Sequence, residues 1–240
     1  MSDSVNSIDR APMPLNPGGS AEPKPRPIDL DTWPRRQHFV HYMESSPCTY
    51  SMTVELDVTE FVSAMRASTR KTYLAQLWAI AAVVNRHEEF RMCLTESGQP
   101  AVWDEIDPSF TVFNKERETF SCVWAPYDPD FGIFHAAAAP ILAEYSAATE
   151  LFPQGGEPAN IFFLSSLPWA SFTGFNLNHQ NAWRNLAPIF TIGRYVEREG
   201  RTLMPLAIQV HHAAADGFHV SRLVNELQEL FTNPEWVGSH

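Results

Sequence analysis

The pattern of hydrophobic and polar residues first becomes regular at residues 49–58, where every second position is apolar. Such alternation predicts a β-strand with one buried face. The spacing then becomes helical, because Phe61, Val62 and Met65 share one face of a helix that begins at Thr59. Residues 72–87 are apolar on nearly all sides, which predicts a second helix that is fully buried against a sheet.

The rest of the chain mixes strands and helices. The β-rich runs lie at residues 91–95, 100–103, 110–114, 119–124, 160–165, 187–197 and 202–211. The first four are separated by turn residues and are expected to pair antiparallel. Residues 130–148 are alanine-rich and predict a helix. A last helix covers residues 220–231 and ends at Asn233-Pro234, so the order of elements indicates an α+β fold.

Composition limits the functions that this chain can have. Its formal net charge of −11 argues against a nucleic-acid partner, although a local basic patch can still hold one phosphorylated ligand. No run of about eighteen uncharged apolar residues occurs, so no membrane span is expected. The first residues lack the pattern of a secretory signal, and the three cysteines form no CxxC pair. We therefore expect a cytoplasmic protein with reduced thiols.

The expected domain organisation follows from a change in composition near residue 28. Residues 1–28 are rich in proline, serine and glycine and offer no face to bury, so a disordered tail is expected. From residue 29 onward aromatic and aliphatic residues stay dense, without repeats or linkers. We expect one domain over residues 29–236, long enough to bury a full core, and a short tail at residues 237–240.

The candidate chemistry lies at the end of the last predicted strand, in the segment His-His-Ala-Ala-Ala-Asp-Gly. Leu206, Ile208 and Val210 alternate with other residues, so a strand that continues to its end places His212 on the same buried face. A partly desolvated histidine stays neutral and can accept a proton from a hydroxyl near pH 7. His212 is therefore a candidate general base, and Asp216-Gly217 is expected to turn the chain into the last helix.

Three other interpretations of this segment remain open. Paired histidines are often hydrogen-bonded core residues, and spacing alone does not separate that role from catalysis. A metal site would use His211, His212, Asp216 and His219, but adjacent strand residues point to opposite faces and cannot easily share one ion. A Ser-His-Asp triad is disfavoured, because an aspartate so close in sequence is poorly placed to hold the imidazole. Asp216 is therefore expected to have a structural partner.

The same segment, continued through Phe218 and His219, resembles the His-His-x-x-x-Asp-Gly signature of the chloramphenicol acetyltransferase family. Other blocks are similar to that family too, in its order and at its spacing. They are Trp33-Pro34-Arg35-Arg36-Gln37-His38-Phe39, Leu151-Phe152-Pro153-Gln154-Gly155, Ser165-Ser166-Leu167-Pro168-Trp169 and Ala187-Pro188-Ile189-Phe190-Thr191. The resemblance covers about residues 29–232, which is almost the entire expected domain.

This resemblance implies a two-layer α/β sandwich with a mixed sheet, assembled as a homotrimer whose active sites lie between subunits. It implies transfer of an acetyl group from acetyl-CoA to a hydroxyl of chloramphenicol, and hence antibiotic resistance, with His212 as the base. Ser165 would stabilise the oxyanion and Thr191 would assist through a water. Asp216 would pair with Arg35 in an architectural role. No metal is implied.

The resemblance also carries over two sets of binding residues. The acetyl-CoA set is Trp169, Tyr195, Arg194 and Lys71, in which the two cations would neutralise the 3′-phosphate. The acceptor set is Tyr42, Cys48, Phe120, Phe175 and Leu177, which would form an apolar cleft for an aromatic antibiotic. Each residue taken singly also fits a plain structural role. Ala214-Ala215 and Ser46 depart from the commoner family pattern, which bears on acceptor affinity.

Three alternative functions remain at this stage. The catalytic core of 2-oxo acid dehydrogenase complexes also has a His-x-x-x-Asp-Gly signature, but residues 1–28 are too short and proline-rich to fold into a lipoyl or peripheral-binding domain. A second alternative is a related CoA-dependent acyltransferase that acts on a different small hydroxylated acceptor. The non-enzymic alternative is a trimeric protein that binds an apolar ligand without turning it over, in which His212 would be dispensable.

Overall fold

The structure is a computed structural model that describes residues 23–178 and 184–238. It contains a main sheet with the strand order β2-β10-β8-β7-β5-β6, and β9 pairs with β10. These strands are β2 (Thr49–Asp57), β5 (Asp107–Asn114), β6 (Thr119–Trp124), β7 (Ile161–Leu167), β8 (Ile189–Gly193), β9 (Val196–Arg198) and β10 (Arg201–His211). The sheet is mixed, as expected, because β7 runs parallel to β5 and β8 while the other pairs are antiparallel.

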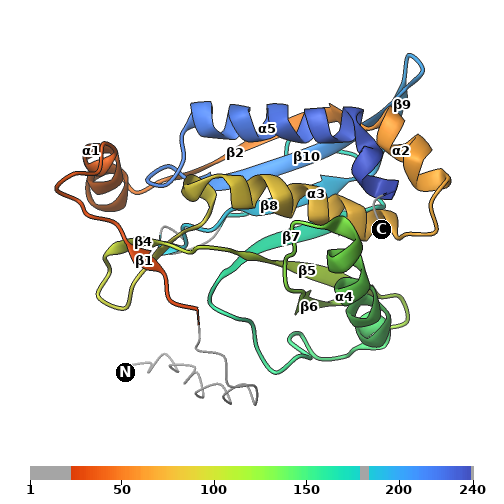
Figure 1. Cartoon of the computed structure of the whole chain (residues 1–240), viewed down its shortest axis with the longest axis horizontal. Coiled ribbons are helices and arrows are strands. Elements are labelled where there is room, and N and C mark those ends of the chain that lie inside the picture. Colours follow the sequence, from red (N-terminus) through yellow and green to blue (C-terminus); the bar gives the residue numbers. More distant parts are fainter. Residues whose placement is uncertain (1–22, 179–183, 239–240) are drawn as a thin grey trace, which may run out of the picture.

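The helices gather on one face of this sheet (Figure 1). They are α2 (Thr59–Arg66), α3 (Thr72–Arg86) and α5 (Gly217–Thr232), with α4 (Phe131–Glu144) beside α3. α1 (Arg36–Val40) and the π-helix η1 (His41–Ser45) lie apart from them, at the end of the molecule where β10 ends. This arrangement gives the expected two layers, and no helix of the described residues covers the far face of the sheet.

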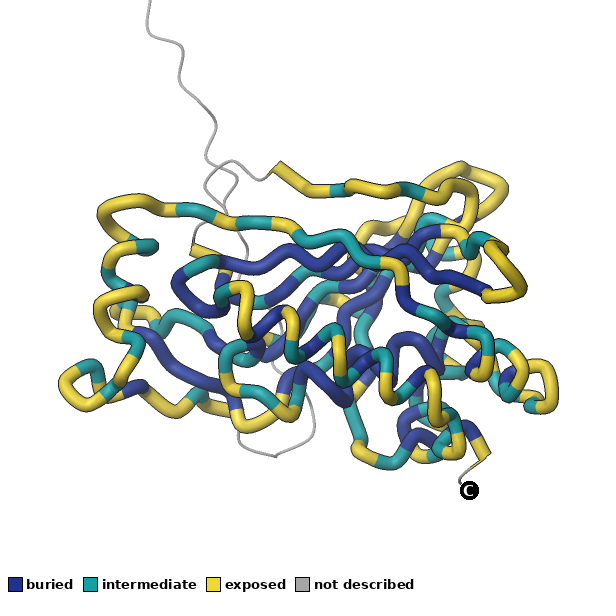
Figure 2. Tube along the Cα trace, turned by 90° about the horizontal axis from the view of Figure 1, so that it is seen from above, coloured by how far each residue is buried: buried dark blue, intermediate teal, exposed yellow. Residues whose placement is uncertain are grey.

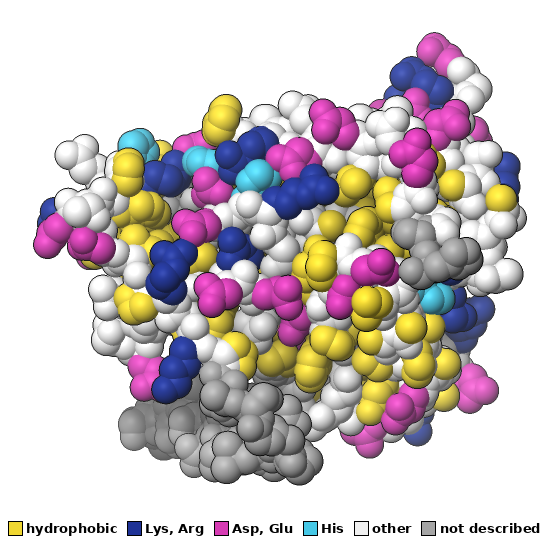
Figure 3. Space-filling model, in the orientation of Figure 1, with side chains coloured by type: hydrophobic (Ala, Val, Ile, Leu, Met, Phe, Trp, Pro, Cys, Tyr) yellow, Lys and Arg dark blue, Asp and Glu magenta, His cyan; other side chains and the backbone are white. Residues whose placement is uncertain are grey.

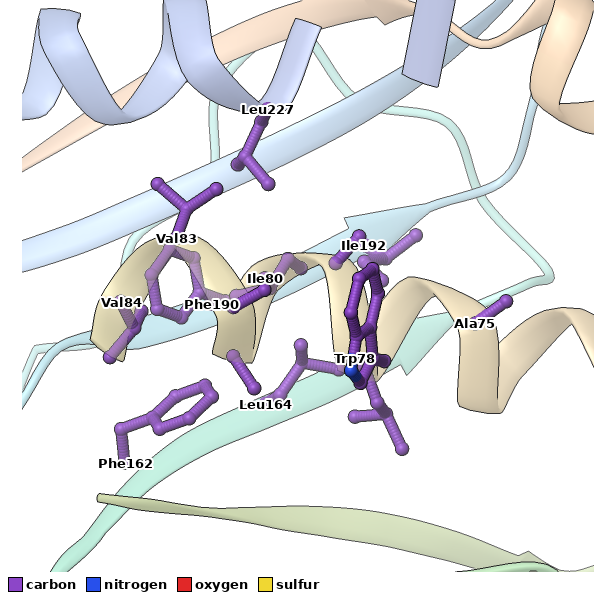
Figure 4. Packing of buried hydrophobic residues seen from close by; sticks show 14 of the residues in the cluster. Ala75, Trp78, Ile80, Val83, Val84, Phe162, Leu164, Phe190, Ile192 and Leu227 are labelled. Carbon is purple, nitrogen blue, oxygen red and sulfur yellow. The ribbon is translucent and has the colours of Figure 1, made fainter. Parts of the chain in front are cut away.

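The core lies between α3 and the sheet, as the apolar character of residues 72–87 predicts. Phe162 and Leu164 of β7 and Phe190 of β8 point toward Ile80 and Val83 of α3 (Figure 4). Every residue of α3 from Leu74 to Val84 is buried, and the central strands are buried along most of their length (Figure 2). Burial of each large apolar side chain contributes about 1.5–3 kcal/mol, so this interface fixes the sheet.

A small second sheet supports α1 and the start of the signature segment. It has the order β1-β4-β3 and consists of β1 (Arg26–Pro27), β3 (Met92–Leu94) and β4 (Pro100–Val102). Its core includes Ile28, Phe39 and the signature alanines Ala213 and Ala214. These two alanines are therefore buried packing residues of this second core.

The structure corrects several predicted boundaries. Arg26–Pro27 pairs with β4, so the folded part begins before the expected limit at residue 28, while residues 1–22 lie outside the described residues. At the other end, η5 (Pro234–Gly238) buries Val237 and extends the fold past residue 236. The single strand expected at residues 187–197 is divided into β8 and β9. β3 pairs antiparallel with β4, and β5 pairs antiparallel with β6, as expected. β5 also pairs with β7, in parallel.

The sheet face opposite the helices carries exposed aromatic residues. Phe113 of β5 stands opposite Phe120 of β6, with 37% and 52% of their surfaces exposed. Trp169 packs edge-on against Phe113, with ring centroids 4.6 Å apart, and is itself 56% exposed. On the surface seen in Figure 3, hydrophobic side chains also gather around α4, where Ile133 is exposed. Contiguous apolar surface of this kind marks a place where another molecule binds.

None of the helices in the described part of the chain combines the length and apolarity needed to cross a membrane.

Candidate active site

His212 follows the last residue of β10 and lies between two aromatic rings. Its imidazole stacks on Tyr42 with the centroids 3.9 Å apart and the planes 7° apart, and it meets Tyr50 edge-on at 5.2 Å. β10 ends at His211, where the predicted run ends, and the ring of His212 is sheltered by Tyr42 of η1 and Tyr50 of β2. His212 is half-buried, so part of the residue stays accessible, which the candidate role of general base requires.

Asp216, in the turn that follows His212, pairs with Arg35 as expected and also caps α5. Nη1 of Arg35 lies 2.7 Å from Oδ2 of Asp216, which is the predicted ion pair. Oδ1 of Asp216 also accepts a hydrogen bond from the Phe218 N–H at 3.0 Å and so caps α5. Burial tends to raise the pKa of the Asp216 carboxyl, but the Arg35 hydrogen bond and the positive charges nearby outweigh it and hold the pKa below its ordinary value.

His211 and His219 make hydrogen bonds within this segment. His211 is 1% exposed, and its Nδ1 accepts from the Ala213 N–H at 3.1 Å. His219 lies against Asp216 and Glu89. In the described residues no group of three histidine, cysteine, aspartate or glutamate side chains is placed to hold a metal ion. The simple structural interpretation of paired histidines therefore fits His211, and the metal interpretation has no support.

Ser165 and Thr191 meet on the far face of the sheet. They are direct neighbours in the parallel pair of β7 and β8, and their hydroxyl oxygens lie 3.2 Å apart. Thr191 in turn stands opposite Ala207 of β10. Thr191 is only 2% exposed, because the segment that follows Trp169 covers it. Two hydroxyls at this distance can present a joint donor to one oxyanion or one bridging water.

Polar side chains hold Phe175 and Leu177 of that covering segment in place. The backbone N–H of Phe175 donates to Oγ1 of Thr53 at 3.3 Å, and the N–H of Leu177 donates to Oε1 of Gln209 at 2.9 Å. Both residues border a small hollow beside Thr191. The periodic pattern does not single out Thr53 or Gln209, although a polar residue in a strand as buried as β10 is a signal for the latter.

A larger cleft of about 740 Å³ opens where β7 and β8 end beside the start of α3. Three of the four expected acetyl-CoA residues, Trp169, Arg194 and Tyr195, line it, and Lys71 directly precedes the lining residue Thr72. Tyr195 is fixed, since its hydroxyl oxygen lies 2.7 Å from Nε2 of Gln76. The structure thus brings three residues of this set together in one cleft and places Lys71 next to it in sequence.

The expected acceptor set falls into separate groups within one chain. The ring of Tyr42 stacks on that of His212, and the backbone carbonyl oxygen of Cys48 accepts a hydrogen bond from the backbone N–H of His212 at 3.1 Å. Phe175 and Leu177 lie with Thr191, in the middle of the sheet, while Phe120 lies at its edge on β6. Ser46 is exposed at the end of η1. No single group contains the whole set.

The separation between His212 and Ser165 follows from the strand register. Ser165, Thr191 and Ala207 stand in one row across the sheet, and His212 comes five residues after Ala207. At about 3.4 Å per residue along a strand and about 4.8 Å between strands, the backbone positions of His212 and Ser165 are on the order of 20 Å apart. A base and an oxyanion donor that act on one carbonyl carbon must lie much closer than that.

Comparisons with known proteins agree on one family. A family model described as chloramphenicol acetyltransferase matches residues 26–228. A chloramphenicol acetyltransferase of Streptomyces acrimycini is 67% identical over 215 residues, which cover 90% of this chain and 98% of that protein. Chloramphenicol acetyltransferase 2 of Haemophilus influenzae is 44% identical over 206 residues, covering 86% and 96% respectively.

Two solved structures show the extent of the fold similarity. A chloramphenicol acetyltransferase superposes with a TM-score of 0.80 at 24% identity, covering 87% of this chain and all of that one. A dihydrolipoamide acetyltransferase of Azotobacter vinelandii superposes with a TM-score of 0.62 at 18% identity, covering 96% of this chain and all of that one. At these identities the likeness concerns the fold alone.

Proposed function

The chain belongs to the chloramphenicol acetyltransferase family, and from this membership we propose how its residues carry out the transfer. The reaction is acetylation of chloramphenicol by acetyl-CoA, and its result is resistance to the antibiotic. The similarity to a 2-oxo acid dehydrogenase core is one of fold, since the sequence relatives at 43% identity or more are chloramphenicol acetyltransferases.

In the proposed mechanism His212 activates the acceptor hydroxyl. Nδ1 of its ring is buried and has no hydrogen-bond partner among the described residues, so Nε2 is the nitrogen that faces the substrate. Nε2 takes the hydroxyl proton while the oxygen attacks the thioester carbon, and the proton then passes to the departing CoA thiolate. The stack on Tyr42 keeps the ring in one orientation through these steps.

Ser165 and Thr191 stabilise the tetrahedral intermediate in this proposal. Attack on the thioester places a negative charge on the former carbonyl oxygen, and the Ser165 hydroxyl can donate a hydrogen bond to it. Thr191, whose oxygen lies 3.2 Å from that of Ser165, fixes the hydroxyl directly or through a water. A donor of this kind contributes about 3–4 kcal/mol to the rate.

The observation that carries the proposed assembly is the distance of about 20 Å between His212 and Ser165 in one chain. Each site therefore combines His212 with Tyr42 and Cys48 from one copy, and Ser165 with Thr191, Phe175 and Leu177 from the next. The exposed aromatic residues on the sheet face opposite the helices supply apolar surface for such a contact. Any closed ring of copies repeats one interface and gives each copy one complete site, and the resemblance to the family makes three the number of copies that we propose.

The cleft beside Trp169 suits the donor substrate. Its lining is largely apolar, as the pantetheine arm requires, and Arg194 with the nearby Lys71 can balance the charge of the 3′-phosphate. Lys71 also directly precedes the first turn of α3, where unpaired N–H groups favour an anion. The three cysteines are free thiols, which supports the cytoplasm as the compartment.

A thiol-release assay tests this function directly. Purified protein, acetyl-CoA and a thiol-reactive dye should give a steady signal only after chloramphenicol is added. A protein that merely binds the antibiotic would give no signal. If the signal appears with another small alcohol but not with chloramphenicol, the acceptor assignment is wrong and the acyltransferase assignment stands.

Asp216→Asn should lower stability and activity together. The Arg35–Asp216 pair is partly buried, with 17% and 32% of the two side chains exposed, so its loss should cost about 2 kcal/mol, between surface and buried values. Because the folded pKa of Asp216 is depressed, this contribution is present above about pH 4 and is lost as the pH falls further. Melting curves of wild type and variant should therefore converge in acid, and normal melting with no activity would contradict an architectural role.

A further inference from the structure

The turn that carries His212 is held by two imidazole nitrogens. Every backbone N–H from His212 to Asp216 has an acceptor within the chain. The acceptor for Ala213 is Nδ1 of His211 and the acceptor for Asp216 is Nδ1 of His219, each at 3.1 Å. An imidazole nitrogen accepts a hydrogen bond only while it carries no proton. The geometry of the turn therefore depends on the protonation of both rings.

The second nitrogen of His219 determines where its proton lies. Nε2 stands 3.3 Å from Oε1 of Glu89 in the short helix η2 (Glu88–Phe90), and Oε2 of Glu89 accepts from Nη2 of Arg222 at 3.1 Å. A carboxylate oxygen lies near each ring nitrogen, since Nδ1 is also 2.9 Å from Oδ1 of Asp216. The backbone fixes the direction of the Asp216 N–H, which points at Nδ1, so Nδ1 must accept and the single ring hydrogen belongs on Nε2, toward Glu89. Glu89 thus favours the tautomer that the turn needs.

His219 takes a place in α5 that is usually held by another residue type. It is the third residue of the helix after the Asp216 cap, where glutamate or glutamine commonly reaches back to the N–H of the capping residue. A histidine there is more rigid and is only 10% exposed, and it links the cap to Glu89 and Arg222. The Arg35–Asp216 pair is therefore one end of a longer chain of contacts.

We propose that His219 is a positioning residue for acetyl transfer: its unprotonated Nδ1 fixes the backbone of Asp216 and thereby the turn that aims His212. The proposal rests on the role of His212 as the base. His219 itself touches neither substrate and acts only through the turn.

A second proton on His219 would undo this arrangement. Nδ1 would then donate to Oδ1 of Asp216, which lies 2.9 Å away, and the Asp216 N–H would lose its acceptor. Glu89 and Asp216 favour that proton, whereas Arg35 and Arg222 oppose it. Burial has the largest effect and lowers the pKa of His219, so the ring is neutral at pH 7.

Two variants of His219 and one matched control test the proposal. His219→Ala should lower kcat about 10- to 100-fold and leave both KM values nearly unchanged, because only the aim of the base is lost. His219→Gln, which can still accept from the Asp216 N–H, should restore most of kcat. The control is His87→Ala. Nε2 of His87 lies 2.7 Å from Oε1 of Glu226, a residue farther along α5, and His87 is buried to a similar extent. Its loss should therefore lower stability and leave kcat unchanged.

A pH series checks that His219 is unprotonated in the folded protein, as hydrogen-bond acceptance at Nδ1 requires. The depressed pKa of His219 means that the unfolded chain takes up its proton first, near pH 6.5, so wild-type stability falls as the pH drops from there. The glutamine variant lacks this group, and its melting temperature should fall less between pH 7 and about pH 5.

Several outcomes would overturn the proposal. Wild-type kcat in His219→Ala would mean that the turn needs no such acceptor, and a glutamine variant no better than alanine would refute hydrogen-bond acceptance. If the alanine variant does not fold, the kcat and the pH series of the glutamine variant still decide. Failure of the function itself looks different, because wild type would then release no thiol or His212→Ala would keep its activity.

Discussion

Replacing His212 with alanine is expected to lower kcat by about 10²- to 10⁴-fold, the usual contribution of a positioned general base. His211 and His219 cannot take its place, since their Nδ1 atoms are already engaged in the turn. The half-buried ring contributes little to the core, so melting temperature and assembly state should stay close to wild type. Steady-state kinetics beside analytical ultracentrifugation measure both.

The control for this experiment is His38→Ala. His38 lies on α1, close in sequence to Tyr42, and is exposed to solvent. Its removal should leave kcat and melting unchanged. Retained turnover in His212→Ala would refute the base, and dissociation of the assembly would mean that the ring has a structural role that the stacking on Tyr42 does not suggest.

Mixing two inactive variants should restore activity, and this result would test the shared site. Ser165→Ala alone should lose about 10²- to 10³-fold in kcat, and His212→Ala at least as much. If each site takes His212 from one copy and Ser165 from another, chains refolded together in equal amounts pair at random. About one quarter of the sites then carry both wild-type residues, so the mixture should regain about one quarter of the wild-type rate.

The matched control is a mixture of Ser165→Ala with Thr191→Ala. These two residues are neighbours in one chain, so a mixed assembly never separates the defects into a complete site. That mixture should stay as slow as its components. If the test pair stays as slow as the control, His212 and Ser165 act from the same chain, against the separation of about 20 Å along the sheet.

The sequence predicted the elements and the family well, for reasons that differ from place to place. Alternation in β2 and β10 and the apolar faces of α3 and α5 reflect burial, which depends on local spacing. The pair of Arg35 and Asp216 could be expected only through the family resemblance, because 181 residues separate the two positions.

Some features had no usable signal in the sequence. The shelter of His212 by Tyr42 depends on a π-helix, and a rare helix type has no distinct pattern of apolar residues. His219 was considered only as a metal ligand, although its place three residues after a capping aspartate points to the role that the structure supports. The strand register that separates His212 from Ser165 requires the order of strands, which local patterns do not give.

The exposed aromatic residues on the sheet face opposite the helices affect the solubility of a newly made chain. If the chain assembles as proposed, a newly made copy first exposes Phe113, Phe120 and Trp169 together, and such apolar surface promotes aggregation. The net charge of −11 opposes this, because like-charged copies repel one another over distances at which apolar contact has no effect. The negative charge therefore opposes aggregation during synthesis, and in the proposed trimer the aromatic residues would make contact only once two copies have come close in the right orientation.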